Sequence, residues 1–306
     1  MSKLLCISFV GNCNNSISLA SIKNRDKNVS FHFIRKTPLN FFRDIITGAC
    51  QAIKSDIVII NYVTLFLIFF PLLKLSKCDI LFIPHEGEPL FPKNITVTHS
   101  LLRRFLSIPS LTRLCIFLAD ETYFLSGLQA NFFEGNIKNI FRLGVDSSQL
   151  VSLENKENIV FFPNRKGEVI KGYDLLDMSK EYLANQGLEE LSFVQMCELY
   201  KRCKIVVIPS FVETYSFCMV EAMLANCIVV TSKEVGLAFD LLNEYGFDTL
   251  VSYGIHVLDS PFNIDAYTKD LVEKNCPPAN TFKLADDLGL DGQMSNEFLS
   301  KLSGRL

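Results

Sequence analysis

Several motifs that mark common kinds of functional site are missing from this sequence of 306 residues. Its ten cysteines form no C-x-x-C pair and follow no regular spacing. Most of them lie in apolar runs, where a thiol behaves as a small hydrophobic group. The sequence also has no D-x-D motif for a metal ion, and we expect no metal site. This use of cysteine is typical of a reducing cytoplasm and argues against a secreted protein.

No signal peptide is predicted from the first residues of the sequence. The first residues, MSKLLCISFVGN, contain a short apolar run and no small-residue cleavage site, so they predict a β-strand. Residues 62–75, YVTLFLIFFPLLKL, approach membrane-spanning length when the preceding strand is added. Asn61 and Thr64 interrupt that run and Pro71 lies inside it. A buried helix, or a helix lying on a membrane surface, is therefore favoured over a spanning helix.

Charge is divided unevenly between the two halves of the chain. The net charge of −3 is the sum of +6 over residues 1–150 and −9 over residues 151–306. A basic first half in an acidic protein indicates a surface that faces lipid head groups or a pyrophosphate-linked acceptor, and chance scatter explains it equally well. Binding of nucleic acid is not indicated, because the net charge is negative and no stripe of basic and aromatic residues occurs.

The length predicts two domains, which we place at residues 1–150 and 151–306 with a polar hinge over 147–158. Apolar runs separated by helical patterns favour a parallel, doubly wound α/β sheet in the first domain. Its predicted helices cover residues 41–54 and 62–75. In the second domain we expect helices over 173–184 and 266–274, and a closing helix over 296–302. The predicted strands of the first domain are residues 3–10, 29–34, 57–61, 80–83, 121–125 and 139–143.

The most informative stretch is CKIVVIPSFVETYSFCMVEAMLANCIVVTS, residues 203–232. It predicts a buried strand, a tight loop, a helix capped by Ser216 or Thr214, and a second strand. Glu213 lies in the loop and Glu221 lies eight positions later in the helix. An ionised carboxylate accepts two hydroxyl hydrogens at once, so each glutamate suits a vicinal diol of a sugar. Spacing alone is weak evidence, because exposed glutamates commonly show it.

With IPS before Glu213 and EAM at Glu221, this stretch resembles the E-x7-E motif of retaining GT-B glycosyltransferases of family 4. The resemblance implies that Glu213 contacts the donor sugar and Glu221 the nucleotide ribose. The helix N-terminus offers free N–H groups and partial positive charge to phosphate. The residues assigned to the donor there are Thr214, Tyr215, Ser216 and Phe217.

A second cationic motif precedes this stretch. PNRKGEVIKGYDLL presents Arg165 and Lys171 beyond a strand end, where cations suit a diphosphate. It resembles the R…K-G pair that binds the donor pyrophosphate in the same family, and Lys166 is a weaker substitute for Arg165. On its own the segment would be interpreted as a lysine-rich surface turn. Its place just before the E-x7-E stretch favours phosphate binding.

Three further positions are assigned with less support. His85 lies in PHEGEP, at the carboxyl end of a predicted strand where open α/β sheets bind ligands, and the resemblance implies contact with the donor sugar. Gly11 ends the first strand, in a loop that is richer in glycine in the family. Backbone near Val194 is expected to meet the base. The family also has a further strand–helix unit between residues 184 and 193, which this sequence is too short to hold.

The resemblance implies a GT-B fold of two Rossmann-like domains facing a central cleft. It also implies transfer of a sugar from a nucleotide-diphosphate donor, with UDP-sugars weakly favoured, no other cofactor, and a metal-independent front-face mechanism. The expected catalytic residues are Arg165, Lys171, Glu213 and His85. We expect a glycan or lipid-linked glycan acceptor, a role in bacterial surface polysaccharide synthesis, and a cytoplasmic protein at the inner membrane face. A catalytically silent nucleotide-sugar-binding subunit and a GT-B phosphorylase or epimerase remain alternatives.

Overall fold

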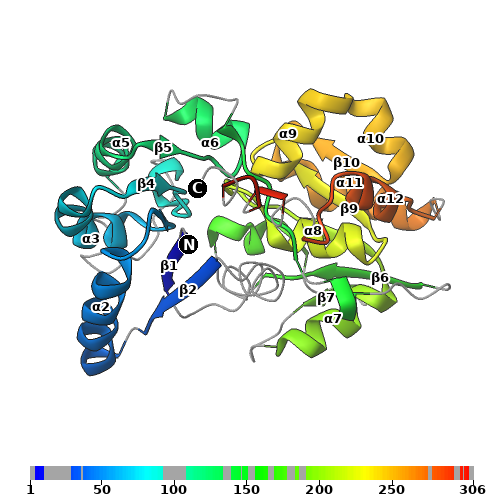
Figure 1. Cartoon of the computed structure of the whole chain (residues 1–306). Helices are drawn as coiled ribbons and strands as arrows, with labels where there is room; N and C mark the ends of the chain where they lie inside the picture. Colours follow the sequence, from blue (N-terminus) through cyan, green and yellow to red (C-terminus); the bar gives the residue numbers. More distant parts are fainter. Residues whose placement is uncertain are drawn as a thin grey trace.

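The computed structural model describes most of the chain, in thirteen ranges. The ranges are residues 4–9, 29–35, 37–91, 108–133, 139–145, 147–150, 156–164, 169–177, 183–185, 191–274, 278–292, 297–298 and 300–302. These residues form two parallel β-sheets, each with helices packed against it (Figure 1). The predicted α/β class is therefore confirmed.

The first sheet has five strands in the order β2-β1-β3-β4-β5, all parallel. Alternation along the strands sends Leu5 and Val58 to one face, under the helices, and Leu4 and Ile57 to the other face, in a cluster continuous with the second domain. Both faces are buried, which explains the continuous β-branched runs. The strands are β1 (Leu4–Phe9), β2 (Val29–Ile34), β3 (Ile57–Ile60), β4 (Asp79–Phe82) and β5 (Glu121–Thr122).

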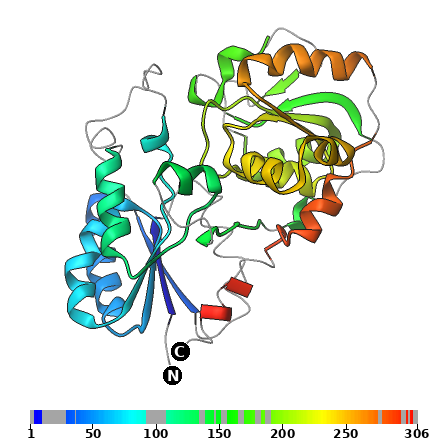
Figure 2. The same cartoon turned by 90° about the horizontal axis from the view of Figure 1, so that it is seen from above.

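Three helices cover the outer face of this sheet, side by side (Figure 2). They are α2 (Pro38–Ala52), α3 (Val63–Ser76) and α5 (Pro109–Leu118), and the short α6 (Gly127–Phe132) follows β5. Helix α2 begins three residues earlier than predicted, because Pro38 occupies a first-turn position where its missing N–H costs nothing. Of the helices in the described part of the chain, none has the length and apolar run needed to cross a membrane.

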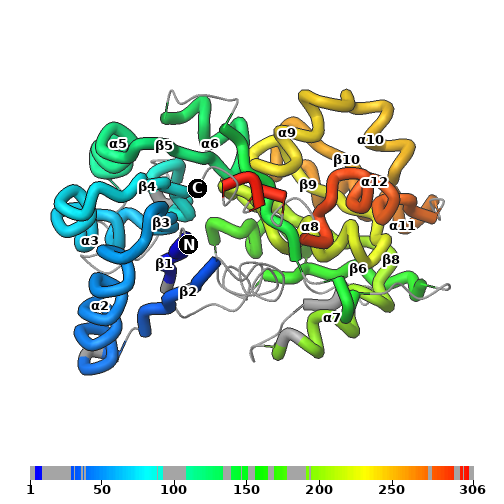
Figure 3. The backbone as a smooth tube through the Cα atoms, in the orientation of Figure 1, coloured from blue at the N-terminus to red at the C-terminus, as the bar shows by residue number. Residues whose placement is uncertain are grey.

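The second sheet has the order β10-β9-β8-β6-β7, again all parallel. Its strands are β6 (Glu157–Phe162), β7 (Leu183–Asn185), β8 (Cys203–Ile208), β9 (Ile228–Ser232) and β10 (Ile255–Leu258). Its helices are α7 (Phe193–Arg202), α8 (Phe217–Leu224), α9 (Gly236–Tyr245), α10 (Phe247–Tyr253), α11 (Ile264–Glu273) and α12 (Thr281–Asp287). Short 3₁₀ turns lie at Glu88–Leu90, Ser147–Gln149, Val169–Lys171, Tyr173–Leu175 and Pro261–Asn263. Helix α12 lies beside α8 (Figure 3).

Two predicted elements are wrong. Residues 139–143 do not form a sixth strand; only Ile140 pairs, through an isolated bridge to Phe124. The helix predicted over 173–184 is replaced by a 3₁₀ turn at Tyr173–Leu175 and by strand β7, which pairs with β6. Strand β7 ends at Asn185, at the start of the stretch between residues 184 and 193 that was predicted to be too short for a complete strand–helix unit. The helix predicted around residues 16–23 and the basic stretch at 99–104 lie outside the described residues.

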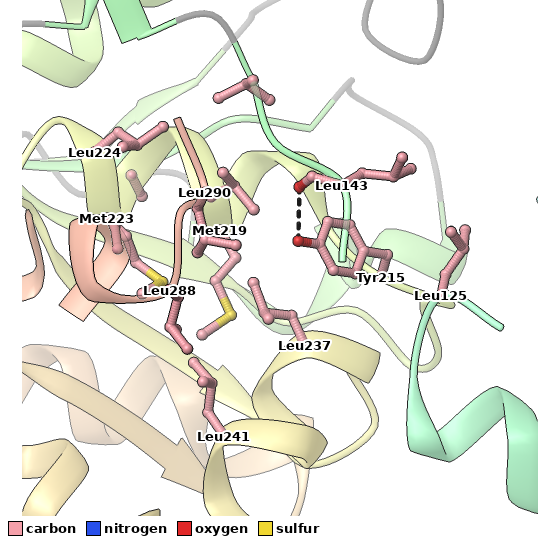
Figure 4. Packing of buried hydrophobic residues seen from close by; sticks show 14 of the residues in the cluster. Leu125, Leu143, Tyr215, Met219, Met223, Leu224, Leu237, Leu241, Leu288 and Leu290 are labelled. Atoms are coloured by element: carbon pink, nitrogen blue, oxygen red, sulfur yellow. Dashed lines mark hydrogen bonds between the residues drawn. The ribbon is translucent and has the colours of Figure 1, made fainter. Parts of the chain in front are cut away.

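The two domains share one apolar cluster. Tyr215 of the second domain points at the segment that follows the first sheet, and its hydroxyl donates to the Leu143 carbonyl at 2.7 Å (Figure 4). Phe298, in the helical residues near the C-terminus, packs on Phe141 and Tyr123 with ring centroids 4.3 and 4.8 Å apart. Buried apolar contacts therefore connect both sheets to the segment between them. The predicted boundary at 150/151 itself stays a prediction.

Candidate active site

Glu213 lies in the loop between β8 and α8, and backbone hydrogen bonds fix its position. Its N–H donates to the Glu234 carbonyl at 3.0 Å, and its carbonyl accepts from the Gly236 N–H at 2.8 Å. Gly236 is required there, because a Cβ would lie 2.2 Å from the Thr214 carbonyl oxygen. The loop that begins after Pro209 is therefore tied to the start of α9.

Lys171 reaches Glu213 from a different loop. Its Nζ lies 2.7 Å from Oε1 of Glu213, and the Ser210 hydroxyl donates to Oε2 at 3.2 Å. Gly172 makes the approach possible: it has φ +75°, and a Cβ there would lie 2.1 Å from the Pro209 carbonyl oxygen. The Phe211 N–H also donates to the Ile170 carbonyl at 2.9 Å. The K-G motif thus places an ammonium group beside the first glutamate of the E-x7-E motif.

The N-terminus of α8 lies next to this pair. Ser216 is the N-cap, as predicted, and its hydroxyl accepts from the Met219 N–H at 3.3 Å. Its φ of 109° is unusual for a residue with a side chain, and such backbone strain gathers at functional sites. The first N–H groups of the helix have no partner within the helix, so they carry partial positive charge.

These groups line a cavity of about 240 Å³. Both domains contribute to it. The first domain supplies His85, Gly87, Phe91 and Leu125, and the second supplies Ile170, Lys171, Val212, Glu213, Thr214, Tyr215, Ser216 and Phe217. The cavity lies at the carboxyl ends of β4 and β8, the edge at which open parallel sheets bind ligands.

Of the cavity residues from the first domain, His85 is the one that was predicted from the sequence. Its backbone N–H donates to the Asn61 carbonyl at 3.1 Å, and its ring lies 5.6 Å from that of Tyr62. Burial lowers the pKa of His85 to about 4, so the imidazole is neutral at pH 7. Its Nε2 is buried and has no hydrogen-bond partner among the described residues. A neutral imidazole with an unused nitrogen is suited to a hydroxyl group of a ligand.

Glu221, the second glutamate of the E-x7-E motif, lies outside the cavity that Glu213 lines. It lies in α8, is 2% exposed and does not line the cavity. Burial raises its pKa to about 7, while contact with the Tyr200 hydroxyl lowers it. Glu221 lies in the part of α8 that is buried throughout, from Met219 to Leu224, whereas Glu213 lies in the loop before the helix. The structure thus brings Lys171, Glu213 and His85 together and leaves Glu221 apart from them.

The other predicted site residues divide into four groups. Thr214, Ser216 and Phe217 line the cavity. Tyr215 also lines the cavity, but its hydroxyl donates a hydrogen bond to the Leu143 carbonyl in the segment that connects the two domains. Val194 is 58% exposed and does not line the cavity. Arg165, Lys166 and Gly11 lie outside the described residues, so their roles stay predictions.

Several apolar residues that line the cavity were not predicted from the sequence. Gly87 and Phe91 follow His85 closely, and Ile170 and Val212 flank the two charged residues. Their closeness in sequence to predicted site residues was the available signal. Leu125 is the last residue of the predicted strand 121–125, so its place at the carboxyl end of a strand was the available signal. Within the described ranges, no group of three histidine, cysteine or carboxylate side chains lies close enough to hold a metal ion.

Comparison with known proteins identifies the fold. No model of a known protein family matches the chain, and no curated protein sequence matches it. The chain is similar to HepE from Anabaena in complex with UDP-glucose, with a TM-score of 0.71 and 12% identity over 100% of both chains. It is also similar to sucrose-phosphate synthase from Thermosynechococcus elongatus, with a TM-score of 0.68 and 11% identity over 99% of this chain and 100% of that one.

A third similar structure is the lipopolysaccharide outer core galactosyltransferase WaaB in its apo form. Its TM-score is 0.62 and its identity 13%, over 98% of this chain and 99% of that one. All three are GT-B glycosyltransferases with two Rossmann-like domains, and the fold of this chain is GT-B. The predicted fold is confirmed; at these identities, the likeness to solved structures extends to the fold alone.

Proposed function

We propose that this protein is a retaining glycosyltransferase that moves a sugar from a nucleotide-diphosphate sugar to a hydroxyl group of a glycan acceptor. The observation that carries the proposal is the cavity in which Lys171, Glu213 and the N-terminus of α8 meet His85 from the other domain. A cation and a helix N-terminus suit a diphosphate, and a carboxylate and a neutral imidazole suit sugar hydroxyls.

In the proposed reaction the bond between the sugar C1 and the diphosphate oxygen breaks, and a bond to the acceptor oxygen forms on the same face. The acceptor proton passes to a phosphate oxygen of the departing diphosphate. Lys171 and the first N–H groups of α8 stabilise the charge that develops on this leaving group, which is usually the largest catalytic contribution. Arg165 is proposed to join them. Glu213 and His85 orient the sugar.

Lys171 and Glu213 have to separate in part for this reaction. In the absence of a donor each neutralises the other at 2.7 Å. A diphosphate carries more negative charge than one carboxylate, so it competes for the ammonium group and releases Glu213 for the sugar hydroxyls. After this exchange the ammonium is paired with the diphosphate and the carboxylate accepts hydrogen bonds from the sugar hydroxyls, so neither group is left unsatisfied in a site whose lining is largely apolar.

UDP is proposed as the nucleotide, since HepE, which shares the fold, has been solved with UDP and with UDP-glucose. From the E-x7-E resemblance, Glu221 is proposed to contact the ribose and backbone near Val194 the base. Neither residue lines the cavity of about 240 Å³, so both contacts would lie outside it. A lipid-linked glycan is proposed as acceptor, in surface polysaccharide synthesis at the inner face of a membrane, on the basis of the +6 net charge of residues 1–150.

A thermal-shift screen against UDP-, GDP- and ADP-glucose tests the donor class, because a ligand that binds only the folded protein stabilises it. We expect the largest shift with a UDP-sugar, reduced in Glu213→Gln. Slow release of UDP and free sugar without acceptor should follow, since water can replace the acceptor. Binding without any release of UDP would favour a silent binding subunit. Release that depends on inorganic phosphate would favour a phosphorylase. No shift with any nucleotide sugar contradicts the proposal.

A further inference from the structure

The outer helices of the first domain expose an unusual number of large apolar side chains. On α2, Leu39, Phe42 and Ile46 are 85%, 68% and 66% exposed. On α5, Phe117 is 83% exposed, and on α3, Leu75 is 82% exposed. Single exposed apolar residues need no explanation, but a set gathered on adjoining helices indicates a contact surface.

The sequence of α2 shows that this exposure is built into the helix. The exposed residues at positions 39, 42 and 46 follow the i, i+3, i+7 spacing of one helix face. Ile45 and Ala49 pack on the sheet side, in the same cluster as Leu5 and Val58. Helix α2 is therefore apolar on two sides, although one apolar stripe is enough to cover a sheet.

Helices α3 and α5 continue the same surface, because α3 packs between α2 and α5 on the outer face of the sheet (Figures 1 and 2). Leu72 of α3 and Leu114 of α5 are 40% and 43% exposed. We call the outward side chains of these three helices the outer face. Its apolar members are Leu39, Phe42, Ile46, Leu72, Leu75, Leu114 and Phe117.

Positive charges outnumber negative charges on these helices by three to one. Arg43, Lys74 and Arg113 belong to α2, α3 and α5, one to each helix. Asp44 is the one carboxylate within the bounds of the three helices, and it is bound by Arg35, with Nη2–Oδ1 at 2.8 Å and Nε–Oδ2 at 2.9 Å. That guanidinium holds the pKa of Asp44 well below its usual range. Arg43 also lies 3.9 Å from Oδ1 of Asp44. Cations still outnumber carboxylates on the three helices, so the outer face combines apolar side chains with an excess of positive charge.

We propose that the outer face docks on the surface of an anionic lipid bilayer, with its apolar side chains among the acyl chains and its cations on the headgroup phosphates. Amphipathic helices that lie in the membrane interface combine these two features. Charge selects lipid over a second copy of this chain, because two outer faces would bring like charges together. The biological purpose of this docking, access to a lipid-linked acceptor, rests on the proposed function. The docking itself does not.

Sedimentation with vesicles tests this docking. The full chain should sediment with vesicles of phosphatidylcholine and phosphatidylglycerol and remain in solution with phosphatidylcholine alone. Added salt should weaken binding, because it screens exposed charges. Lys74→Gln should reduce the partition coefficient by about fivefold, the effect of one cation at an anionic surface.

Removal of apolar contacts gives a second, matched comparison. The double variant Phe42→Asp, Phe117→Asp should lose binding by about tenfold or more, since it removes two aromatic anchors and adds two negative charges. Phe262→Asp is the control: Phe262 is 66% exposed, close to Phe42, but lies in the second domain. Its binding should match that of the unmodified protein. Circular dichroism and the thermal midpoint establish that each variant is folded.

Three results would overturn the proposal. The first is the absence of sedimentation with anionic vesicles, and the second is a loss of vesicle binding in Phe262→Asp equal to that in the double variant. The third is concentration-dependent dimerisation, seen by analytical ultracentrifugation, that Phe42→Asp abolishes. This third result would assign the outer face to a second copy of this chain. Failure here is separable from failure of the proposed function, because UDP-sugar binding is measured without lipid and none of the substituted residues lines the cavity.

Discussion

The Lys171 ammonium lies 2.7 Å from the Glu213 carboxylate, and the pair joins two loops that are 42 residues apart in sequence. Their side chains are 24% and 16% exposed, so water screens the pair only in part. Each residue belongs to a separate short motif, K-G in one loop and E-x7-E in the next. Their contact turns two weak sequence signals into one arrangement with a defined geometry.

The first prediction concerns the charge of Lys171. Lys171→Met keeps the length of the side chain but removes the cation that is proposed to stabilise the departing diphosphate. We expect kcat to fall by about 10²–10³-fold, the effect of removing one such donor. Measurement of UDP release with a saturating UDP-sugar checks this. The control is Lys233→Met, since Lys233 also pairs with a carboxylate, Asp259 at 3.2 Å, but does not line the cavity. Equal rates in both folded variants would contradict the assignment.

The second prediction concerns the backbone that carries Lys171. Gly172→Ala places a Cβ 2.1 Å from the Pro209 carbonyl oxygen, so the 169–172 turn has to move away from the loop of Glu213. We expect donor affinity to fall at least about tenfold even though Lys171 is retained, because misplacing a positioning group by an ångström is costly. Isothermal titration calorimetry with a UDP-sugar measures it.

Gly246→Ala is the control for Gly172→Ala. Gly246 also has positive φ, +76°, but a Cβ there would meet nothing within 4 Å. This variant suffers backbone strain without displacing the site, so its thermal midpoint should fall while its donor affinity is unchanged. Loss of affinity in both variants would show that general destabilisation, rather than displacement of Lys171, explains the effect.

The β8–α8–β9 unit shows what the sequence can specify locally. A continuous β-branched run predicted β8, Ser216 or Thr214 was predicted to cap the helix, and a second strand was predicted after it. Both strands and the Ser216 cap were confirmed, and Asn226, just beyond the helix, adopts the left-handed conformation with φ 55°. Short-range rules suffice here because the signals lie within a turn of the positions that they determine.

Elements that depend on distant partners were predicted less well. Strand β7 has only three residues and is defined by its pairing with β6, so no local sequence pattern predicted it. Residues 139–143 have a strand-like sequence, but beyond the bridge at Ile140 they find no partner strand among the described residues. The same limit applies to the site. The loop position of Glu213 was predictable, whereas the burial of Glu221 depends on residues distant in sequence, such as Tyr200, whose hydroxyl lies beside its carboxylate.

The third prediction follows from the burial of Glu221, which raises its pKa to about 7 from an ordinary value of 4.5. The folded protein therefore binds more protons than the unfolded chain between these values, so stability falls as pH rises from about 4.5 to 7. Above pH 7 the full cost of the buried charge applies, about 3 kcal/mol. Glu221→Gln removes this cost, and its thermal midpoint should exceed that of the unmodified protein at pH 8 but not at pH 4.5.

Measurement of thermal midpoints from pH 4.5 to 8 tests the Glu221 prediction. The control is Glu273→Gln, because Glu273 is on the exposed side of α11 and pairs loosely with Lys269 at 3.8 Å. Its pH profile should follow that of the unmodified protein. If Glu221→Gln keeps the original pH dependence as well, Glu221 is ionised in the folded protein at neutral pH, and the buried carboxylate has a compensating partner.

The fourth prediction concerns the joint between α6 and α9. Oδ1 of Asp240 accepts a hydrogen bond from the Gly127 N–H at 2.7 Å, and a Cβ on Gly127 would lie 2.8 Å from the same oxygen. Oδ2 is buried and has no hydrogen-bond partner among the described residues, and burial raises the pKa of Asp240 to about 6. This hydrogen bond between the two domains therefore depends on the Asp240 carboxylate, whose ionised form destabilises the folded protein.

Two substitutions separate the hydrogen bond from the charge. Asp240→Ala leaves the buried Gly127 N–H unsatisfied, which should cost about 1–3 kcal/mol relative to Asp240→Asn at every pH. Asp240→Asn keeps an oxygen for Gly127 and removes the charge. Because the raised pKa destabilises the folded protein as pH rises toward 6 and beyond, Asp240→Asn should be at least as stable as the unmodified protein at pH 8. Thermal midpoints at pH 5 and pH 8 test both. If Asp240→Asn is as damaging as Asp240→Ala at pH 8, the charge itself holds the joint, through its attraction to Arg142.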